Sequence, residues 1–240
     1  MVLSLTALIE LFSSLSLGIL AYRWWQVFNE RKSPVTRLFF YFVGILSLYF
    51  FFDSFLILLF AENSLALKFS VISGVFFQSL ACAFLAYLII HIFIPKIDPI
   101  FGFSFIFILG LIGTFLAIFI PFSPFLRSIE PIKTIEWNFP LPIGLLQSFI
   151  FSITLLPISF IFLFYSQASK PLFIKLRSVG MALAFLFGLN AGFVNFFSNN
   201  WLKIGPLGGD ISLGLFSLFL FLLLLYFSFQ NEDYKEREEV

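Results

Sequence analysis

The chain has 240 residues, of which 60% are hydrophobic and 11% charged, and its formal net charge is +1. A water-soluble domain carries roughly a quarter charged residues, so this composition excludes a soluble globular domain and offers no basis for nucleic-acid binding. One cysteine, Cys82, and one histidine, His91, exclude an intramolecular disulfide and a Cys- or His-based metal site. Without a phosphate loop, an HExxH motif or a paired acid and nucleophile, the sequence predicts neither an enzyme nor a cofactor.

Several apolar stretches reach the length of about 20 residues that a helix needs to cross a bilayer. Polar breaks such as "NERKSP", "PKIDP" and "SQASKP" separate them. The N-terminal stretch lacks the basic start of a cleavable signal, so we expect it to be a retained helix. We predict an all-α membrane protein, a seven-transmembrane-helix bundle over residues 1–229 with a short acidic tail at 230–240. The expected helices are 3–23, 38–61, 70–94, 100–120, 143–165, 179–200 and 211–229.

The distribution of Lys and Arg predicts the orientation of this bundle, because cytoplasmic loops are enriched in these residues. Of the 14 Lys and Arg residues, one set of alternate segments holds Arg23, Arg31, Lys32, Arg37, Lys96, Lys170, Lys175, Arg177, Lys235 and Arg237. The opposite set holds Lys68, Arg127, Lys133 and Lys203. We therefore expect an outside N-terminus and a cytoplasmic C-terminus in the plasma or inner membrane.

The longest connection, 121–142, lies on the predicted outer side. Its apolar and polar positions alternate between Ile129 and Trp137, and prolines bound it. We expect a small extended element or an interfacial segment over the outer mouth of the bundle, either a functional lid or a passive cover.

Polar residues inside the predicted helices gather at one depth. At about 1.5 Å of rise per residue, six of them fall in the outer half: Glu10, Asp53, Gln78, Gln147, Asn190 and Asn195. Intramembrane carboxyl groups are rare and often functional. Asp53 is either protonated and bonded to an amide of a neighbouring helix, or ionised and facing a water-filled vestibule, with Tyr49 one turn away. Glu10 is a weaker candidate, because a tilt of its helix would bring it to the outer interface.

The segment "GLNAGFVNFFSNNW" at 188–201 places amides among small residues. At about 100° per residue, Gly188, Gly192, Asn195 and Asn199 share one helix face, while Asn190 points the other way. Gly74 belongs to a similar face with Ser70 and Gln78. Small residues of this kind mark helix packing, so we expect the three glycines at helix contacts and the amides against protein or trapped water. Asn199 and Asn200 are expected to cap a helix end.

The overall layout allows a family comparison. A microbial rhodopsin is excluded, because the last helix, "ISLGLFSLFLFLLLLYFSF", has no Lys for a retinal Schiff base. Three stretches resemble the seven-transmembrane sensor region at the N-terminus of some bacterial histidine kinases: "GILAYRWWQVFNERKSPVTRLFFYFVGILSL", "KLRSVGMALAFLFGLNAGF" and "GPLGGDISLGLFSLFLFLLLLYFSF". The resemblance implies a signal-receiving membrane module, and it assigns no role to any residue. No kinase follows Gln230 in this sequence, so output would require a separate protein.

Three functions follow as hypotheses. The first is a non-catalytic, receptor-like sensor in the lipid bilayer, with an outward polar pocket for a small ligand and a protein partner for signal output. The second is a small-solute or proton transporter using Asp53, although few polar groups lie in the inner half and no internal repeat is evident. The third is an accessory subunit of a larger membrane complex.

Overall fold

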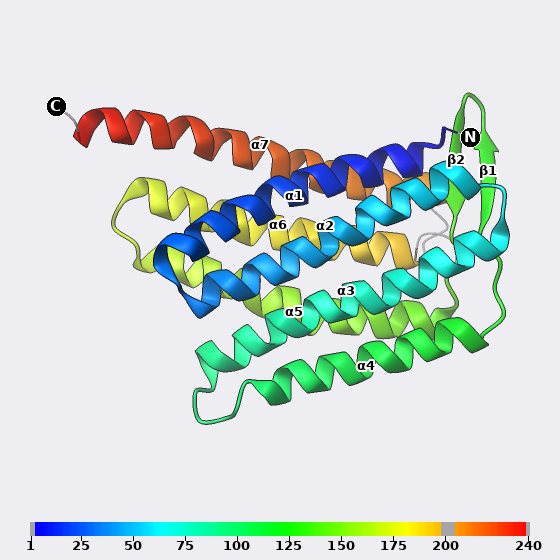
Figure 1. The fold of residues 1–240 in the computed structure, drawn as a ribbon, viewed down its shortest axis with the longest axis horizontal. Helices are drawn as coiled ribbons and strands as arrows, with labels where there is room; N and C mark the ends of the chain where they lie inside the picture. The colour runs from blue at the N-terminus through cyan, green and yellow to red at the C-terminus, as the bar shows by residue number, and fades with distance from the viewer. Residues whose placement is uncertain (1–2, 198–204, 239–240) are drawn as a thin grey trace.

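The computed structural model describes residues 3–197 and 205–238, and in that part the chain forms a bundle of seven helices with one β-hairpin (Figure 1). Each helix is long and apolar enough to cross a membrane. The predicted all-α, seven-helix membrane fold is therefore confirmed, and the chain is a multi-pass membrane protein. The helices are α1 (Leu5–Arg31), α2 (Pro34–Phe60), α3 (Ser64–Phe93), α4 (Ile100–Phe119), α5 (Leu141–Ala168), α6 (Leu172–Phe197) and α7 (Pro206–Glu238).

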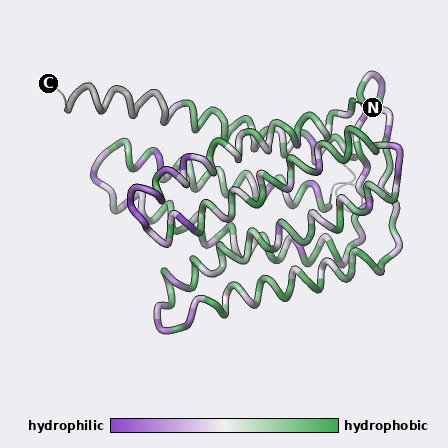
Figure 2. The backbone as a smooth tube through the Cα atoms, in the orientation of Figure 1, coloured by the Kyte–Doolittle hydropathy of each residue, from purple (hydrophilic) through white to green (hydrophobic). Residues whose placement is uncertain are grey.

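Most helices extend beyond the apolar stretches. Helix α1 continues to Arg31, where the left-handed Lys32 (φ 52°) ends it by donating its N–H to the Phe28 carbonyl. Helix α6 begins at Leu172, seven residues before the predicted 179. Hydropathy locates only the part of a helix that lies in hydrocarbon, whereas backbone hydrogen bonds extend the helix into the polar boundary. Figure 2 shows this pattern, with hydrophilic positions gathered at the ends of the bundle.

Six of the seven helices form a closed ring, and α4 lies outside it. Consecutive contacts run α1–α2–α3–α5–α6–α7, and α7 returns to α1. Helix α4 packs on the outside of this ring, against α3 and α5 (Figure 1). The interior of the bundle is therefore enclosed by the six ring helices.

The connection between α4 and α5 forms strands β1 (Phe125–Ile129) and β2 (Ile132–Glu136), paired antiparallel with Leu126 opposite Ile135. The hairpin lies at the end of the bundle where α1 begins (Figure 1), called here the hairpin end. Strand β2 contacts both α1 and α7. Ile135, Trp137 and Phe139 are buried against helix residues that include Phe196, so this segment packs on the ring rather than standing free of it.

Candidate functional site

Two helices of the ring hold Asp53 between hydroxyl groups. The Tyr49 hydroxyl, one turn earlier on α2, donates to Asp53 Oδ2 at 2.9 Å, and the Ser70 hydroxyl of α3 donates to Asp53 Oδ1. Asp53 is only 3% exposed. Both carboxyl oxygens are therefore bonded inside the protein, and their partners are hydroxyls rather than the amide or the open vestibule that the sequence suggested.

Glu10 of α1 lies beside this group. Its carboxyl lies near the Asp53 carboxyl. Glu10 is 4% exposed, and its Oε2 atom has no hydrogen-bond partner. Glu10 therefore faces the interior of the ring, where it lines the central cavity described below.

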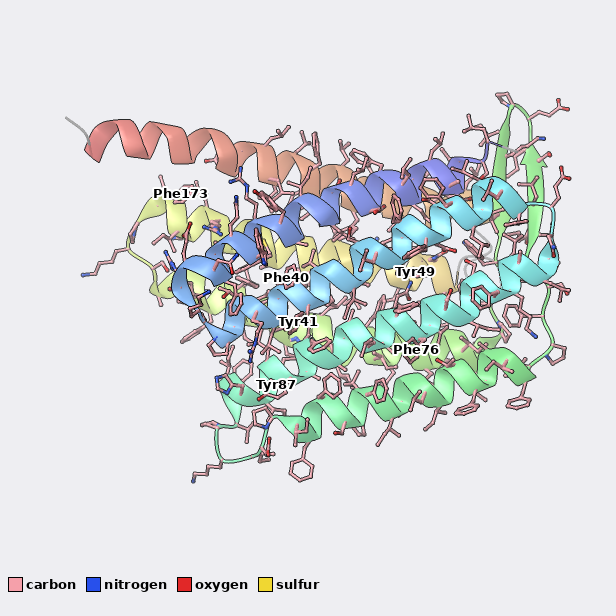
Figure 3. The ribbon with its side chains drawn as sticks, in the orientation of Figure 1. Phe40, Tyr41, Tyr49, Phe76, Tyr87 and Phe173 are labelled. Carbon is pink, nitrogen blue, oxygen red and sulfur yellow. The ribbon has the colours of Figure 1, made fainter. Side chains whose placement is uncertain are left out.

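Gly74 and Gln78 of α3 face the same interior. A Cβ atom at Gly74 would lie 2.5 Å from the Tyr49 hydroxyl oxygen, so the missing side chain allows Tyr49 to lie against α3 and reach Asp53. One turn along, Gln78 is partly buried and its Oε1 atom has no partner. Figure 3 shows Tyr49 on α2 in the half of the bundle nearer the hairpin.

Helix α6 presents its small residues and Asn195 to the interior. A Cβ at Gly192 would lie 2.5 Å from the Phe151 ring of α5, and one at Gly188 would lie 3.4 Å from the Phe216 ring of α7. Asn195 Oδ1 lies 2.7 Å from the position that a Cβ at Gly209 would take. Gly188 and Gly192 therefore lie at helix contacts, as predicted. Both also border the interior of the ring.

Two of the sequence candidates lie elsewhere. Gln147 is fully buried between α5 and α3, where its Nε2 donates to Ser79 Oγ at 3.0 Å and to the Val75 carbonyl at 3.3 Å. Asn190 is exposed on α6. Within the single chain, the expectation that the amides of this segment face protein or trapped water is therefore not met at Asn190. Asn199 and Asn200 lie outside the described residues.

A cavity of about 120 Å³ occupies the centre of the ring. Its polar lining lies toward the hairpin end, and its remaining lining is almost entirely apolar. The polar members are Glu10, Tyr49, Gln78 and Asn195, and the apolar ones include Leu20, Phe39, Val43, Met181, Ala184 and Phe185. Of the described residues that line it, none is Lys, Arg or His. The polar groups therefore lie in the hairpin-side part of the cavity, where Trp137 and Phe139 also line it, and the rest of the lining is apolar.

The hairpin connects to this cavity through Trp137 and Phe139, which belong to its lining. Asp53, Gln147 and Asn190 do not belong to the described lining. Of the six residues predicted for the pocket, Glu10, Gln78 and Asn195 line one cavity. Asp53 lies outside this lining and accepts a hydrogen bond from Tyr49, which belongs to it.

A third buried acid, Asp210, was missed by sequence reasoning. Its Oδ2 accepts from Thr134 of β2 at 2.5 Å and from Thr6 of α1 at 2.9 Å, while Thr6 Oγ1 accepts the Ile135 N–H at 2.9 Å. Asp210 is 4% exposed. The predicted last helix began at residue 211, so Asp210 was assigned to a loop, although "GGD" directly before an apolar run could have marked it. This hydrogen-bonded group fastens the hairpin to α1 and α7.

Loss of this network should loosen the hairpin. Thr134→Val keeps the shape of the side chain but removes one donor to Asp210 and should raise amide exchange in residues 125–139 about tenfold, given about 1 to 1.5 kcal/mol for such a bond. Hydrogen-exchange mass spectrometry measures this directly. Thr114→Val is the matched control, because Thr114 Oγ1 donates only within α4, to the Gly110 carbonyl at 2.8 Å. Equal exchange in Thr134→Val and the wild type would show that apolar packing alone holds the hairpin.

Comparison of this chain with protein-family models, with curated proteins and with solved structures finds no match. The resemblance to a histidine-kinase sensor region therefore has no family match behind it.

Proposed function

We propose that this protein is a membrane sensor module that binds a small molecule in the central cavity and signals through a separate protein. The observation that carries the proposal is the pair of unpartnered oxygens, Glu10 Oε2 and Gln78 Oε1, on the wall of the cavity. A buried polar atom without a partner costs about 1 to 3 kcal/mol. A ligand that donates hydrogen bonds to these atoms removes that cost, which supports a binding role for the cavity.

The position of the polar groups favours binding over transport. A transport path needs polar groups along its whole length, whereas the half of the cavity away from the hairpin is bordered by side chains such as Leu20, Phe39 and Met181. Both oxygens of Asp53, the residue on which the transport hypothesis depends, already accept hydrogen bonds. The apolar half of the cavity and the bonded Asp53 therefore favour the sensor hypothesis over the transport hypothesis.

Native mass spectrometry of protein released from gently solubilised membranes tests the proposal. We expect the wild type to carry an added small-molecule mass that Ala184→Phe loses, because Ala184 lines the cavity and is 5% exposed. Leu183→Phe is the matched control, since the neighbouring Leu183 is 39% exposed on the outside of α6. A wild type without any added mass, or equal retention in both variants, would remove the basis for a ligand in this cavity.

The proposal places the hairpin end outside the cell, as the Lys and Arg distribution indicates. In a Cys82→Ala background, Ser128→Cys on the hairpin should react with a membrane-impermeant maleimide on intact cells. Lys170→Cys, in the turn between α5 and α6, should react only after permeabilisation. Both positions are exposed, so the opposite result would invert the orientation and turn the hairpin toward the cytoplasm.

The exposed Asn190 supports a contact between α6 and another membrane protein. Such a contact is expected both for signal output and for an accessory subunit of a larger complex. Its exposed amide lies on α6 about 10 Å from the hairpin-side end, at 1.5 Å per residue. An amide facing hydrocarbon is unfavourable, and amides bond well across helix contacts. Asn190→Leu should therefore abolish stoichiometric co-purification of a partner while leaving the bound small molecule in place. Unchanged co-purification would exclude this face as the contact.

A further inference from the structure

The two ends of the cavity differ in chemistry, and this difference specifies the class of ligand. From Glu10 to Leu20 on α1, the lining runs about 15 Å along the bundle at 1.5 Å per residue. Over this distance it changes from carboxyl, hydroxyl and amide groups to aliphatic and aromatic side chains. A ligand that fills such a cavity has one polar end and one apolar end.

The polar end determines the head group of that ligand. The two free atoms, Glu10 Oε2 and Gln78 Oε1, are oxygens, and an amide oxygen can only accept a hydrogen bond. Glu10 also lies beside the Asp53 carboxyl, and the described lining contains no cation. A carboxylate or phosphate head would meet two carboxyl groups without a balancing charge, whereas a hydroxyl or ammonium head would supply the missing donor.

The volume determines the size. A cavity of about 120 Å³ is slightly smaller than an engineered apolar cavity of about 150 Å³ that binds benzene. It therefore takes a molecule of six or so carbon atoms rather than a phospholipid with two long chains. Gly188 and Gly192 border this space, and their missing side chains make room for the rings of Phe216 and Phe151.

We propose, building on the sensor function above, that the ligand is a small amphiphile with an apolar chain and a hydrogen-bond-donating head that carries no negative charge, such as a short-chain alcohol or amine. The head donates to Gln78 Oε1, on the cavity lining that also includes Tyr49 and Glu10. The chain points toward Val43, Ala184 and Phe185. Asp53 acts as a positioning residue, since it touches the ligand only through Tyr49 and Glu10.

Calorimetric titration of the full chain in lipid nanodiscs tests this class, with empty nanodiscs subtracted. Hexylamine and hexanol should each bind at least tenfold tighter than hexanoate, which has the same chain and a negative head. Methyl pentanoate, which is of similar size but has no donor, should bind like hexanoate. The ratio between hexylamine and hexanol then tells which of the two heads fits better.

Two variants locate the binding. Gln78→Leu should weaken hexanol about tenfold, the loss expected for one hydrogen bond of about 1 to 1.5 kcal/mol, while leaving hexanoate unchanged. Ala184→Phe should abolish binding of the whole series, and Leu183→Phe should not. If Ala184→Phe fails to fold, the Gln78→Leu comparison still tests the assignment, because it changes only the polar end.

The outcomes separate this inference from the proposed function. Equal or tighter binding of hexanoate, or a Gln78→Leu protein that binds hexanol like the wild type, overturns the ligand class. If the mass-spectrometric test still finds a native ligand that Ala184→Phe loses, the sensor function stands with another class of ligand. If no probe binds and no native ligand is found, both proposals fail.

Discussion

Asp53→Ala is expected to lower the free energy of unfolding by about 2 to 4 kcal/mol, because each buried hydroxyl that loses its acceptor costs about 1 to 3 kcal/mol. The two hydroxyls are those of Tyr49 and Ser70, and each donates to one oxygen of Asp53. Asp53→Asn should cost less, since an amide oxygen still accepts one of these bonds. Unfolding by increasing dodecyl sulfate in mixed micelles measures the change.

The control for Asp53→Ala is Glu62→Ala, which removes an exposed acid from the turn between α2 and α3 and should leave the free energy of unfolding unchanged. If Asp53→Ala were as stable as the wild type, the unfavourable free energy of burying the carboxyl beside Glu10 would equal the favourable free energy of its hydrogen bonds. Such a balance is found for some buried charged groups.

Gly102→Ala should destabilise the bundle by about 1 to 3 kcal/mol, the range found when side chains are inserted into well-packed cores. Gly102 brings α4 against α3, and a Cβ atom there would lie 2.8 Å from the Ala86 carbonyl oxygen and 2.7 Å from Ile90 Cγ1. The carbonyl belongs to the backbone of α3 and cannot rotate away, so the two helices have to separate. Thermal unfolding in detergent and in nanodiscs measures the loss.

Gly44→Ala is the matched control for this prediction. A Cβ at Gly44 has its nearest neighbour at 4.0 Å, a ring carbon of Phe40, which is ordinary contact. Alanine there should leave stability unchanged or raise it by up to about 1 kcal/mol through its higher helix propensity. A Gly102→Ala protein that behaves like Gly44→Ala would show that α3 and α4 are not held as closely as the structure indicates.

The amino-acid sequence determined those properties that depend on one segment at a time. The length of each apolar stretch predicted seven spans, since transfer into hydrocarbon sums over the residues of a single helix. Depth could also be predicted along each helix, which placed Glu10, Gln78 and Asn195 in the outer half of the predicted bundle, and these three residues line one cavity. The helix ends were less well predicted, and this is how Asp210 was missed.

Which side chains meet was decided only by the tertiary structure. Gln78 and Gln147 look alike in the sequence, yet one lines the cavity and the other ties α5 to α3. A membrane helix is apolar on nearly all sides, so hydropathy does not indicate which face turns inward. That rotation depends on the neighbours that each helix finds, as when Gly74 admits Tyr49 to reach Asp53 and when Asn190 is left on the outer face of α6.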